Sequence, residues 1–272
     1  MTDDPDTTLA STSTPSKPEP APHRGTRSAN ADRPTKQVRR GIVSFVRRSP
    51  RMNESQQRAM DTLASTYLID VPRDTTSTSV APGPYLDLPG IFGRTAPVTV
   101  EIGTGAGTVL ASLAQAHPDR DFIGFEVYLP SVASTLNKLH ATNATNARVI
   151  LADAAAGIDR LFAPQHVDEV WTFFPDPWRK RRHHKRRIVN PDIARLVASR
   201  LRPGGLWRLA TDWDDYASWM VNVLSAEPLL EPVNANGFSP RWEERPLTRY
   251  EEKGLAAGRT VRDLTWRRVD ES

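Results

Sequence analysis

From residue 98 onward, strand-like segments alternate with helix-like segments, and this alternation limits the possible folds more than any other feature. The first segment, Val98–Ile102, is rich in β-branched residues and is followed by a glycine-rich turn and a helical pattern. Further strands are predicted at residues 122–127, 148–151, 167–174 and 206–210, and helices at 109–117, 131–140, 191–201 and 216–224. Strands that alternate with helices form a parallel sheet covered on both faces. The sequence therefore predicts a doubly wound α/β fold.

The two ends of the chain differ from this regular part. Residues 259–268 alternate with a period of two and predict an antiparallel strand at the edge of the mostly parallel sheet. Residues 1–40 are rich in Pro, Ser, Thr and Ala and contain no aromatic residue, so we expect a disordered tail. The predicted organisation is this tail and one domain, 41–272, in which a basic extension (41–95, with a helix at 54–65) precedes the core (96–272).

Basic residues are concentrated in two stretches, although the net charge is only +4. Residues 33–58 hold eight Lys or Arg against one acid, and residues 179–187 hold seven. Such clusters are the footprint expected of a phosphate-rich partner, although a solvated surface or a disordered tail has the same composition. The absence of cysteine excludes disulfides and thiolate chemistry. No signal peptide or membrane-spanning run is recognisable, so we expect a cytoplasmic protein.

The turn after the first strand reads Glu-Ile-Gly-Thr-Gly-Ala-Gly, with glycines at Gly103, Gly105 and Gly107. Glycines allow a tight turn and close approach of the backbone to a ligand. The spacing is one residue shorter than the dinucleotide fingerprint, and Glu101 stands two residues before the first glycine. A pyrophosphate is repelled by that carboxylate, whereas the cationic S-adenosylmethionine is attracted. The motif therefore favours S-adenosylmethionine over NAD as cofactor, with a purely structural turn as the alternative.

Two further acids follow the second and third predicted strands. Glu126 is placed to hold both ribose hydroxyls of such a cofactor, and Asp153 to accept from its adenine amino group. Either acid alone is also compatible with a solvated surface position. Three acids at successive strand ends converge on the crevice where doubly wound sheets bind ligands.

The segment Phe-Phe-Pro-Asp-Pro-Trp, residues 173–178, follows the fourth strand and leads into the second basic stretch. The prolines restrict the backbone around Asp176, while Phe174 and Trp178 supply flat faces. Acid, aromatic face and phosphate clamp together suggest chemistry on a nucleic-acid base, and a loop turn with a capping Asp is the alternative. His183 and His184 lie in a basic run without nearby acids, so contacts with RNA or water are favoured over a metal site.

A second face of the acceptor site is predicted from two later motifs. Asp212, in Ala-Thr-Asp-Trp, can accept from guanine N1 and N2. A short loop then offers a hydroxyl, a guanidinium, an aromatic ring and a carboxylate at Thr248, Arg249, Tyr250 and Glu251.

These motifs, in this order, resemble the bacterial tRNA (guanine-N7-)-methyltransferases over residues 41–268. The resemblance implies a Rossmann-like class I methyltransferase sheet and methyl transfer from S-adenosylmethionine to N7 of a variable-loop guanine (position 46 of tRNA). It implies that Glu101, Glu126, Asp153 and Asp176 line the cofactor site, that Asp176 is the catalytic residue, and that Lys180, Asp212 and residues 248–251 contact tRNA. No metal or membrane partner is expected, and monomer and homodimer both remain open. The alternatives are methylation of an exocyclic amine of RNA or DNA, a non-catalytic RNA-binding protein and, least favoured, an NAD-dependent dehydrogenase.

Overall fold

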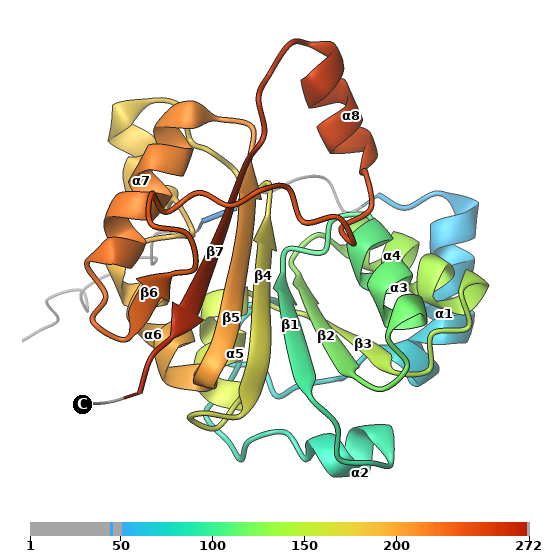
Figure 1. Ribbon diagram of the computed structural model, residues 1–272. Coiled ribbons are helices and arrows are strands. Elements are labelled where there is room, and N and C mark those ends of the chain that lie inside the picture. The colour runs from blue at the N-terminus through green and yellow to red at the C-terminus, as the bar shows by residue number, and fades with distance from the viewer. Residues whose placement is uncertain (1–43, 46–50, 271–272) are drawn as a thin grey trace, which may run out of the picture. The chain divides into compact units, whose positions relative to one another are not determined.

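The computed structural model describes residues 44–45 and 51–270; the predicted tail 1–40 lies outside the described residues. A seven-stranded sheet with the order β3-β2-β1-β4-β5-β7-β6 forms the centre of the described part (Figure 1). The strands are β1 (Val98–Ile102), β2 (Asp121–Glu126), β3 (Ala147–Leu151), β4 (Val167–Phe173), β5 (Leu201–Thr211), β6 (Leu230–Pro232) and β7 (Arg262–Arg268). β1 to β5 pair in parallel, and β7 pairs antiparallel with β5. The doubly wound, mostly parallel sheet expected from the sequence is confirmed.

Two strand predictions need correction. The antiparallel strand β7 is not outermost, because the three-residue strand β6 pairs with its outer side. The fifth strand begins at Leu201 and not at residue 206, and its added part, residues 201–205, is irregular, with a left-handed φ of 77° at Gly204. Its register against β4 shifts between Val167 and Glu169, which is how the glycines are accommodated within a strand.

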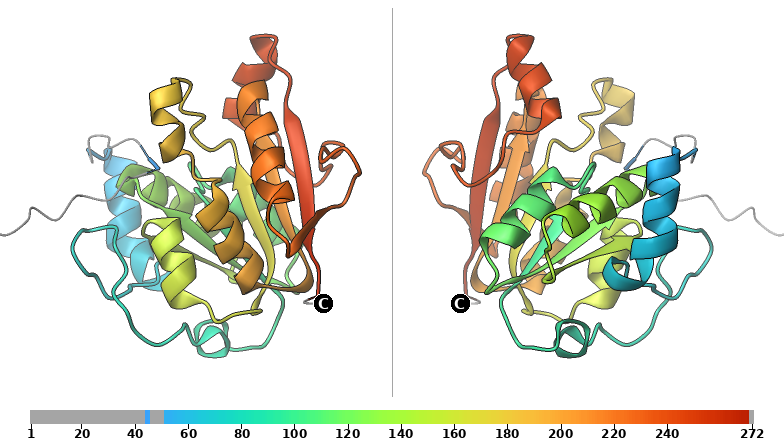
Figure 2. Two further views of the ribbon diagram at one scale, coloured as in Figure 1. Left: turned by 90° about the vertical axis from the view of Figure 1, so that its left-hand side faces the viewer. Right: turned by 90° about the vertical axis from the view of Figure 1, so that its right-hand side faces the viewer.

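Helices cover the sheet in two layers, which Figure 2 shows from opposite sides. One layer holds α1 (Glu54–Tyr67), α3 (Thr108–Ala116) and α4 (Leu129–Ala141), and the other holds α5 (Ala154–Leu161), α6 (Pro191–Arg200) and α7 (Asp214–Ser225). Each layer packs on its own apolar cluster. In α4, for example, Val132, Leu136 and Leu139 recur on one face and are completely buried. Burying one such side chain contributes about 1.5–3 kcal/mol, so these faces hold the helices on the sheet.

Three α-helices were not predicted. α2 (Leu88–Phe92) lies in the Pro- and Gly-rich connection, and α5 follows Asp153 directly. α8 (Arg249–Ala256) contains most of the segment expected to be a loop at 248–251, and it stands beyond the carboxyl ends of the parallel strands (Figure 1). These helices are short or rich in small and polar residues, so no long apolar period marks them.

The strand order places the topological switch point of the sheet at the carboxyl ends of β1 and β4. The chain winds outward from β1 to β2 and β3, then returns to β4 on the other side of β1. Doubly wound sheets bind ligands at such a switch point. Among the described residues, no helix is long and apolar enough to cross a membrane.

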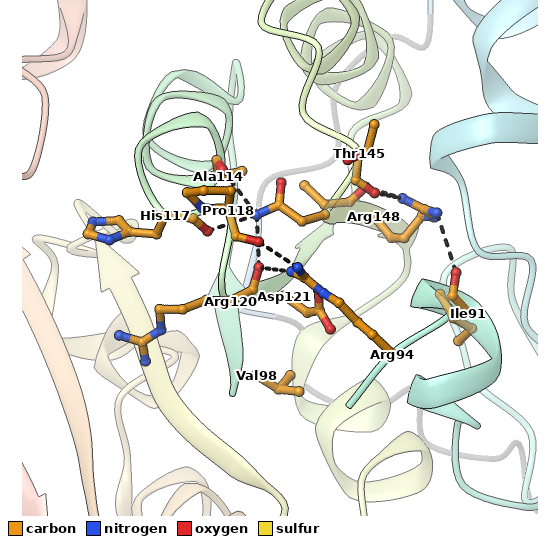
Figure 3. A network of polar contacts seen from close by, with 12 residues as sticks. Ile91, Arg94, Val98, Ala114, His117, Pro118, Arg120, Asp121, Thr145 and Arg148 are labelled. Carbon is orange, nitrogen blue, oxygen red and sulfur yellow. Dashed lines mark hydrogen bonds and ion pairs between the residues drawn. The ribbon is translucent and has the colours of Figure 1, made fainter. Parts of the chain in front are cut away.

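The opposite, amino-terminal edge of the sheet is closed by a polar network (Figure 3). The buried carboxylate of Asp121 accepts two hydrogen bonds from Arg94, at 3.0 and 2.7 Å. The amide of Asn146, at the start of β3, donates to the carbonyl oxygens of Ala114, His117 and Arg120 at 2.8–3.0 Å. This network fixes the loops that enter β1, β2 and β3.

Candidate functional site

The glycine-rich turn connects β1 to α3 with left-handed backbone at all three glycines. The φ angles are 79° at Gly103, 53° at Gly105 and 75° at Gly107, a region that only glycine enters without strain. A Cβ at Gly107 would lie 2.5 Å from the side chain of Thr135, whereas one at Gly103 or Gly105 would meet nothing within 4 Å. The turn thus packs tightly against α4 at its end and is open at its start.

Glu101 is the most perturbed acid of this region. Its side chain is buried on β1, and burial together with the charge of Glu126 raises the pKa of Glu101 to about 8. Its Oε2 atom has no hydrogen-bond partner among the described residues. A buried acceptor without a partner is costly, so a ligand that brings a positive charge with N–H donors is favoured here.

Glu126 ends the neighbouring strand β2 and is bonded to the glycine turn. Its carboxylate accepts from the backbone N–H groups of Gly105, Val127 and Tyr128 at 2.9, 2.7 and 3.0 Å. Because Glu101 pairs with Gly124 in the parallel ladder, the two acids lie at the same edge of the sheet. The structure therefore brings together the first two acids predicted from the sequence.

Asp153 follows β3, the next strand along the same edge, and it is the N-cap of α5. Its Oδ1 accepts from the N–H groups of Ala155 and Ala156 at 2.9 and 3.3 Å. Capping an N-terminus in this way satisfies helix donors that otherwise have no partner. The side chain has a structural role in addition to the ligand contact predicted for it.

The loop that carries Asp176 has strained backbone on both sides of that residue. Phe174 and Trp178 have φ angles of 52° and 46°, which costs a non-glycine residue on the order of 1–3 kcal/mol. The loop is held by hydrogen bonds from the Phe174 N–H to the Ala210 carbonyl (2.7 Å) and from Trp178 Nε1 to the Ser44 carbonyl (2.9 Å). Asp176 itself is exposed, three residues after the end of β4.

The second basic stretch divides into side chains that face the protein and side chains that face solvent. Arg187 is fully buried: its Nε donates to the carbonyl of Pro177 at 3.0 Å, and its Nη2 is bonded to Asp215. The guanidinium also packs on the rings of Tyr216 and Trp219, with its Cζ at 4.7 and 5.3 Å from their centroids. Arg187 therefore ties the loop after Asp176 to α7.

Arg186 and both histidines also contact protein. The Cζ of Arg186 lies 3.6 Å from the ring centroid of Trp178, and its Nη2 donates to the Phe45 carbonyl at 2.9 Å. His183 packs edge-on against Trp178, and Nε2 of His184 lies 3.2 Å from Nη2 of Arg187. Residues 183–187 of the second basic stretch consequently support Trp178 and the loop that carries Asp176.

Lys180 belongs to the solvent-facing half. It is exposed at the start of the 3₁₀ helix η1 (Arg181–Arg186), and it makes no side-chain hydrogen bond or ion pair with any residue that the structure describes. Arg179 beside it stacks over Trp213, with its Cζ 4.4 Å from the ring centroid. These two cations lie at the rim of the loop, as a contact with a phosphate backbone requires.

Asp212 is buried just after β5 and is held by two later residues. Arg259 Nε donates to its Oδ2 at 2.6 Å, and the Tyr250 hydroxyl donates to its Oδ1 at 3.4 Å. The ring of Tyr250 packs on Phe174, with 5.4 Å between the centroids, which joins α8 to the Asp176 loop. Burial, followed by the nearby Asp212 carboxylate, raises the pKa of Tyr250.

An open cavity of about 420 Å³ adjoins Asp212. Its lining residues are Asp212, Trp213, Asp214, Asp215, Gly258, Arg259 and Thr260. Asp212 is the only predicted site residue in this lining, so the cavity adjoins one part of the predicted acceptor site.

The four residues at 248–251 have different environments. Thr248 is the N-cap of α8 and accepts from the N–H of Glu251 at 3.2 Å, while Arg249 and Tyr250 are exposed. Glu251 is fully buried, and its Oε2 accepts from Arg245 Nη1 at 2.7 Å. Its carboxylate is enclosed by protein partners, so the tRNA contact predicted for it requires an exchange of these ion pairs.

Sequence reasoning missed the arginines that hold the predicted acids. Arg259 pairs with Asp212, and Arg245 and Arg241 pair with Glu251. The local sequence does not distinguish these arginines from exposed ones, because the partners are distant along the chain. Arg259 lies 47 residues from Asp212, and Arg241 lies 10 residues from Glu251. Once the structure shows that Asp212 and Glu251 are buried, counter-charges for them are required, but the sequence does not show that burial.

The chain matches a family model described as "Putative methyltransferase" over residues 95–264. A tRNA (guanine-N(7)-)-methyltransferase of Cutibacterium acnes is 78% identical over 247 residues, which cover 90% of each chain. The protein of the same name from Nocardioides sp. is 45% identical and covers 84% of this chain and 88% of its own length. That of Paraburkholderia xenovorans is 43% identical, with 85% and 84% covered.

Proposed function

The chain belongs to the family of tRNA (guanine-N(7)-)-methyltransferases, and on this premise we propose that it transfers a methyl group from S-adenosylmethionine to N7 of a guanine in tRNA. The observation that carries the proposal is the 78% identity to a relative of that name over 90% of both chains. The position of the guanine, in the variable loop, is proposed from the resemblance of the motifs.

The residues at the carboxyl edge of the sheet fit the cofactor. S-adenosylmethionine supplies an electrophilic methyl group on a sulfonium, together with an α-amino group that carries N–H donors. Oε2 of Glu101, which has no hydrogen-bond partner in the described part of the chain, is an acceptor for such a donor, and the open turn at Gly103 and Gly105 leaves room for a ligand beside it. Glu126 and Asp153 would hold the ribose hydroxyls and the adenine amino group, since they follow the next two strands of the same edge.

Guanine N7 carries an in-plane lone pair, so no proton has to be removed before attack. Catalysis then depends mainly on positioning and on stabilising the charge that develops on the purine. Asp176 is exposed on a loop whose strained backbone is fixed on both sides. We assign it the role of orienting the base and stabilising this charge; it does not act as an obligatory base.

The tRNA side of the site combines cations, an aromatic ring and an acceptor. Lys180 and Arg249 are exposed and would bind phosphates of the tRNA backbone. Asp212 borders the cavity, and its carboxylate is held by Arg259 and Tyr250. Asp212 would accept from guanine N1 and N2, and Thr248 and Tyr250 would complete this face. Glu251 would act by holding α8 in place.

The test is incubation of the protein with labelled S-adenosylmethionine and unmodified tRNA, followed by nuclease digestion and mass spectrometry. The expected product is 7-methylguanosine, and a tRNA with 7-deazaguanine at the modified position, which lacks N7, should accept no label. A methyl group on an exocyclic amine would identify the rival reaction. Failure to bind S-adenosylmethionine in calorimetry would favour a non-catalytic RNA-binding protein.

A further inference from the structure

Arg245 is a fully buried arginine that bridges α8 and β7, the two elements that follow it in the chain. Its Nη1 donates to Glu251 of α8 at 2.7 Å. Its Nη2 donates to both oxygens of Asp263 in β7, at 3.0 and 3.1 Å. A planar guanidinium can hold two carboxylates in fixed directions at once, which a lysine ammonium cannot do with the same geometry.

The same guanidinium also touches the start of the Asp176 loop. Its Cζ lies 5.2 Å from the ring centroids of both Phe173 and Phe174. Phe174 is the strained residue two positions before Asp176, and Tyr250 of α8 packs on its ring. Arg245 therefore contacts, in one place, the helix assigned to tRNA binding and the loop assigned to catalysis.

α8 has few other attachments to the body of the protein. Glu251 and Gly254 are its only buried residues, and Tyr250 and Leu255 are about half exposed, at 48% and 47%. The Glu251 carboxylate is thus the main inward anchor of the helix. Because Arg241 also pairs with Glu251, loss of Arg245 leaves this carboxylate partly compensated.

We propose that Arg245 is a positioning residue that sets α8, and with it the tRNA contacts at 248–250, against the Asp176 loop. This inference rests on the proposed function. An error of about 1 Å in the position of a reacting group can cost about a hundred-fold in rate. Replacing Arg245 should accordingly impair methylation of tRNA without impairing the binding of S-adenosylmethionine, since Arg245 contacts none of the residues assigned to the cofactor except through the loop.

The experiment compares wild type, Arg245→Met, Arg245→Lys and the control Arg267→Met. Arg267 lies on β7, the strand that also carries Asp263, and pairs there with Leu206 of β5; its side chain is 48% exposed and pairs with Glu231 at 3.7 Å. We expect Arg245→Met to lose about ten- to a hundred-fold in kcat/KM for tRNA, with Arg245→Lys intermediate and Arg267→Met unchanged. Calorimetric titration with S-adenosylmethionine counts the folded sites, and its Kd should stay within about twofold of wild type.

A double-mutant cycle with Tyr250→Ala separates positioning from a general structural role. If Arg245 acts through α8, removing the Tyr250 ring should reduce the effect of Arg245→Met on kcat/KM by at least about threefold. Effects that multiply independently, an unchanged kcat/KM, or a parallel loss of cofactor affinity would each overturn the inference. Glu251→Gln leaves the Arg245–Asp263 ion pair intact and should show the same loss of kcat/KM for tRNA. This variant tests the inference even if Arg245→Met folds poorly. A wild-type protein that fails to methylate unmodified tRNA would instead overturn the proposed function on which the inference depends.

Discussion

The Asp121 and Asn146 side chains at the amino edge of the sheet and the Glu101 carboxylate at its carboxyl edge differ in how fully their polar groups are paired. At the amino edge, Asp121 is paired with Arg94, and Asn146 donates to three carbonyl oxygens within one network (Figure 3). At the carboxyl edge, Glu101 keeps a buried oxygen without a partner among the described residues, and backbone strain flanks Asp176. The first arrangement lowers the free energy of the folded state, whereas the second raises it.

This difference indicates that the carboxyl edge of the sheet is the functional site. Strain and unsatisfied polar groups persist only where the surrounding structure over-determines them, and they gather at functional sites. Variants at the two edges should therefore separate stability from activity.

The largest effect is expected at Asp176. Asp176→Asn keeps the shape of the side chain but removes the charge that stabilises the developing positive charge on guanine, so kcat should fall by about 10²–10³-fold. The affinity for tRNA, measured by filter binding, should stay near the wild-type value. Asp192→Asn, an exposed acid on α6, is the matched control. Full kcat in Asp176→Asn with normal tRNA binding would contradict the assigned role.

A change at the amino edge should produce the reverse pattern. Arg94→Met leaves the buried carboxylate of Asp121 without its partner, which should reduce the free energy of unfolding by about 3 kcal/mol. Denaturant unfolding measures this loss, and kcat/KM at a temperature where the variant is folded should match wild type. The exposed pair in the control Arg160→Met should contribute less than about 1 kcal/mol. A loss of activity in folded Arg94→Met would mean that the two edges are coupled.

Glu101→Gln should improve stability and impair binding at the same site. The pKa of Glu101 is raised from 4.5 to about 8, so between these values the folded protein holds a proton that the unfolded chain has released. Stability therefore falls as pH rises through this range, and the neutral glutamine should remove that loss. Thermal unfolding of the variant should show a higher Tm than wild type above pH 8 and a smaller difference near pH 5.

Binding of S-adenosylmethionine gives the opposite readout for Glu101. The ionised carboxylate is the form that attracts a cation, so wild-type affinity should increase with pH up to about 8 and then level off. Glu101→Gln should bind about 10–100-fold more weakly, as expected for a lost charged hydrogen bond, and without this pH dependence. Equal affinity of the two proteins at pH 8.5 would exclude Glu101 from the cofactor site.

The sequence was sufficient for those parts of the fold and site that depend on local pattern. Consecutive residues specify the alternating strands, the helical period of α4 and the glycine turn. Acids that follow parallel strands must lie at the same edge of the sheet. Burial of Glu251 and Arg245 could not be predicted, because it depends on pairing with β7 and on the path of the chain before α8. Composition likewise could not separate buried Arg187 from exposed Lys180 within one run of cations.

That last distinction leads to the smallest predicted effect. Lys180→Ala should remove one phosphate contact, which weakens tRNA binding and lowers the slope of log Kd against log salt by about 0.7–0.9. Arg187→Met should leave this slope unchanged, because Arg187 is buried against Pro177 and Asp215, but it should reduce stability. Arg195→Ala, an exposed arginine on α6, controls for a general change in charge. An equal change of slope in Lys180→Ala and Arg187→Met would mean that the basic stretch acts as one surface, and the division between its inward and outward halves would have no consequence for tRNA binding.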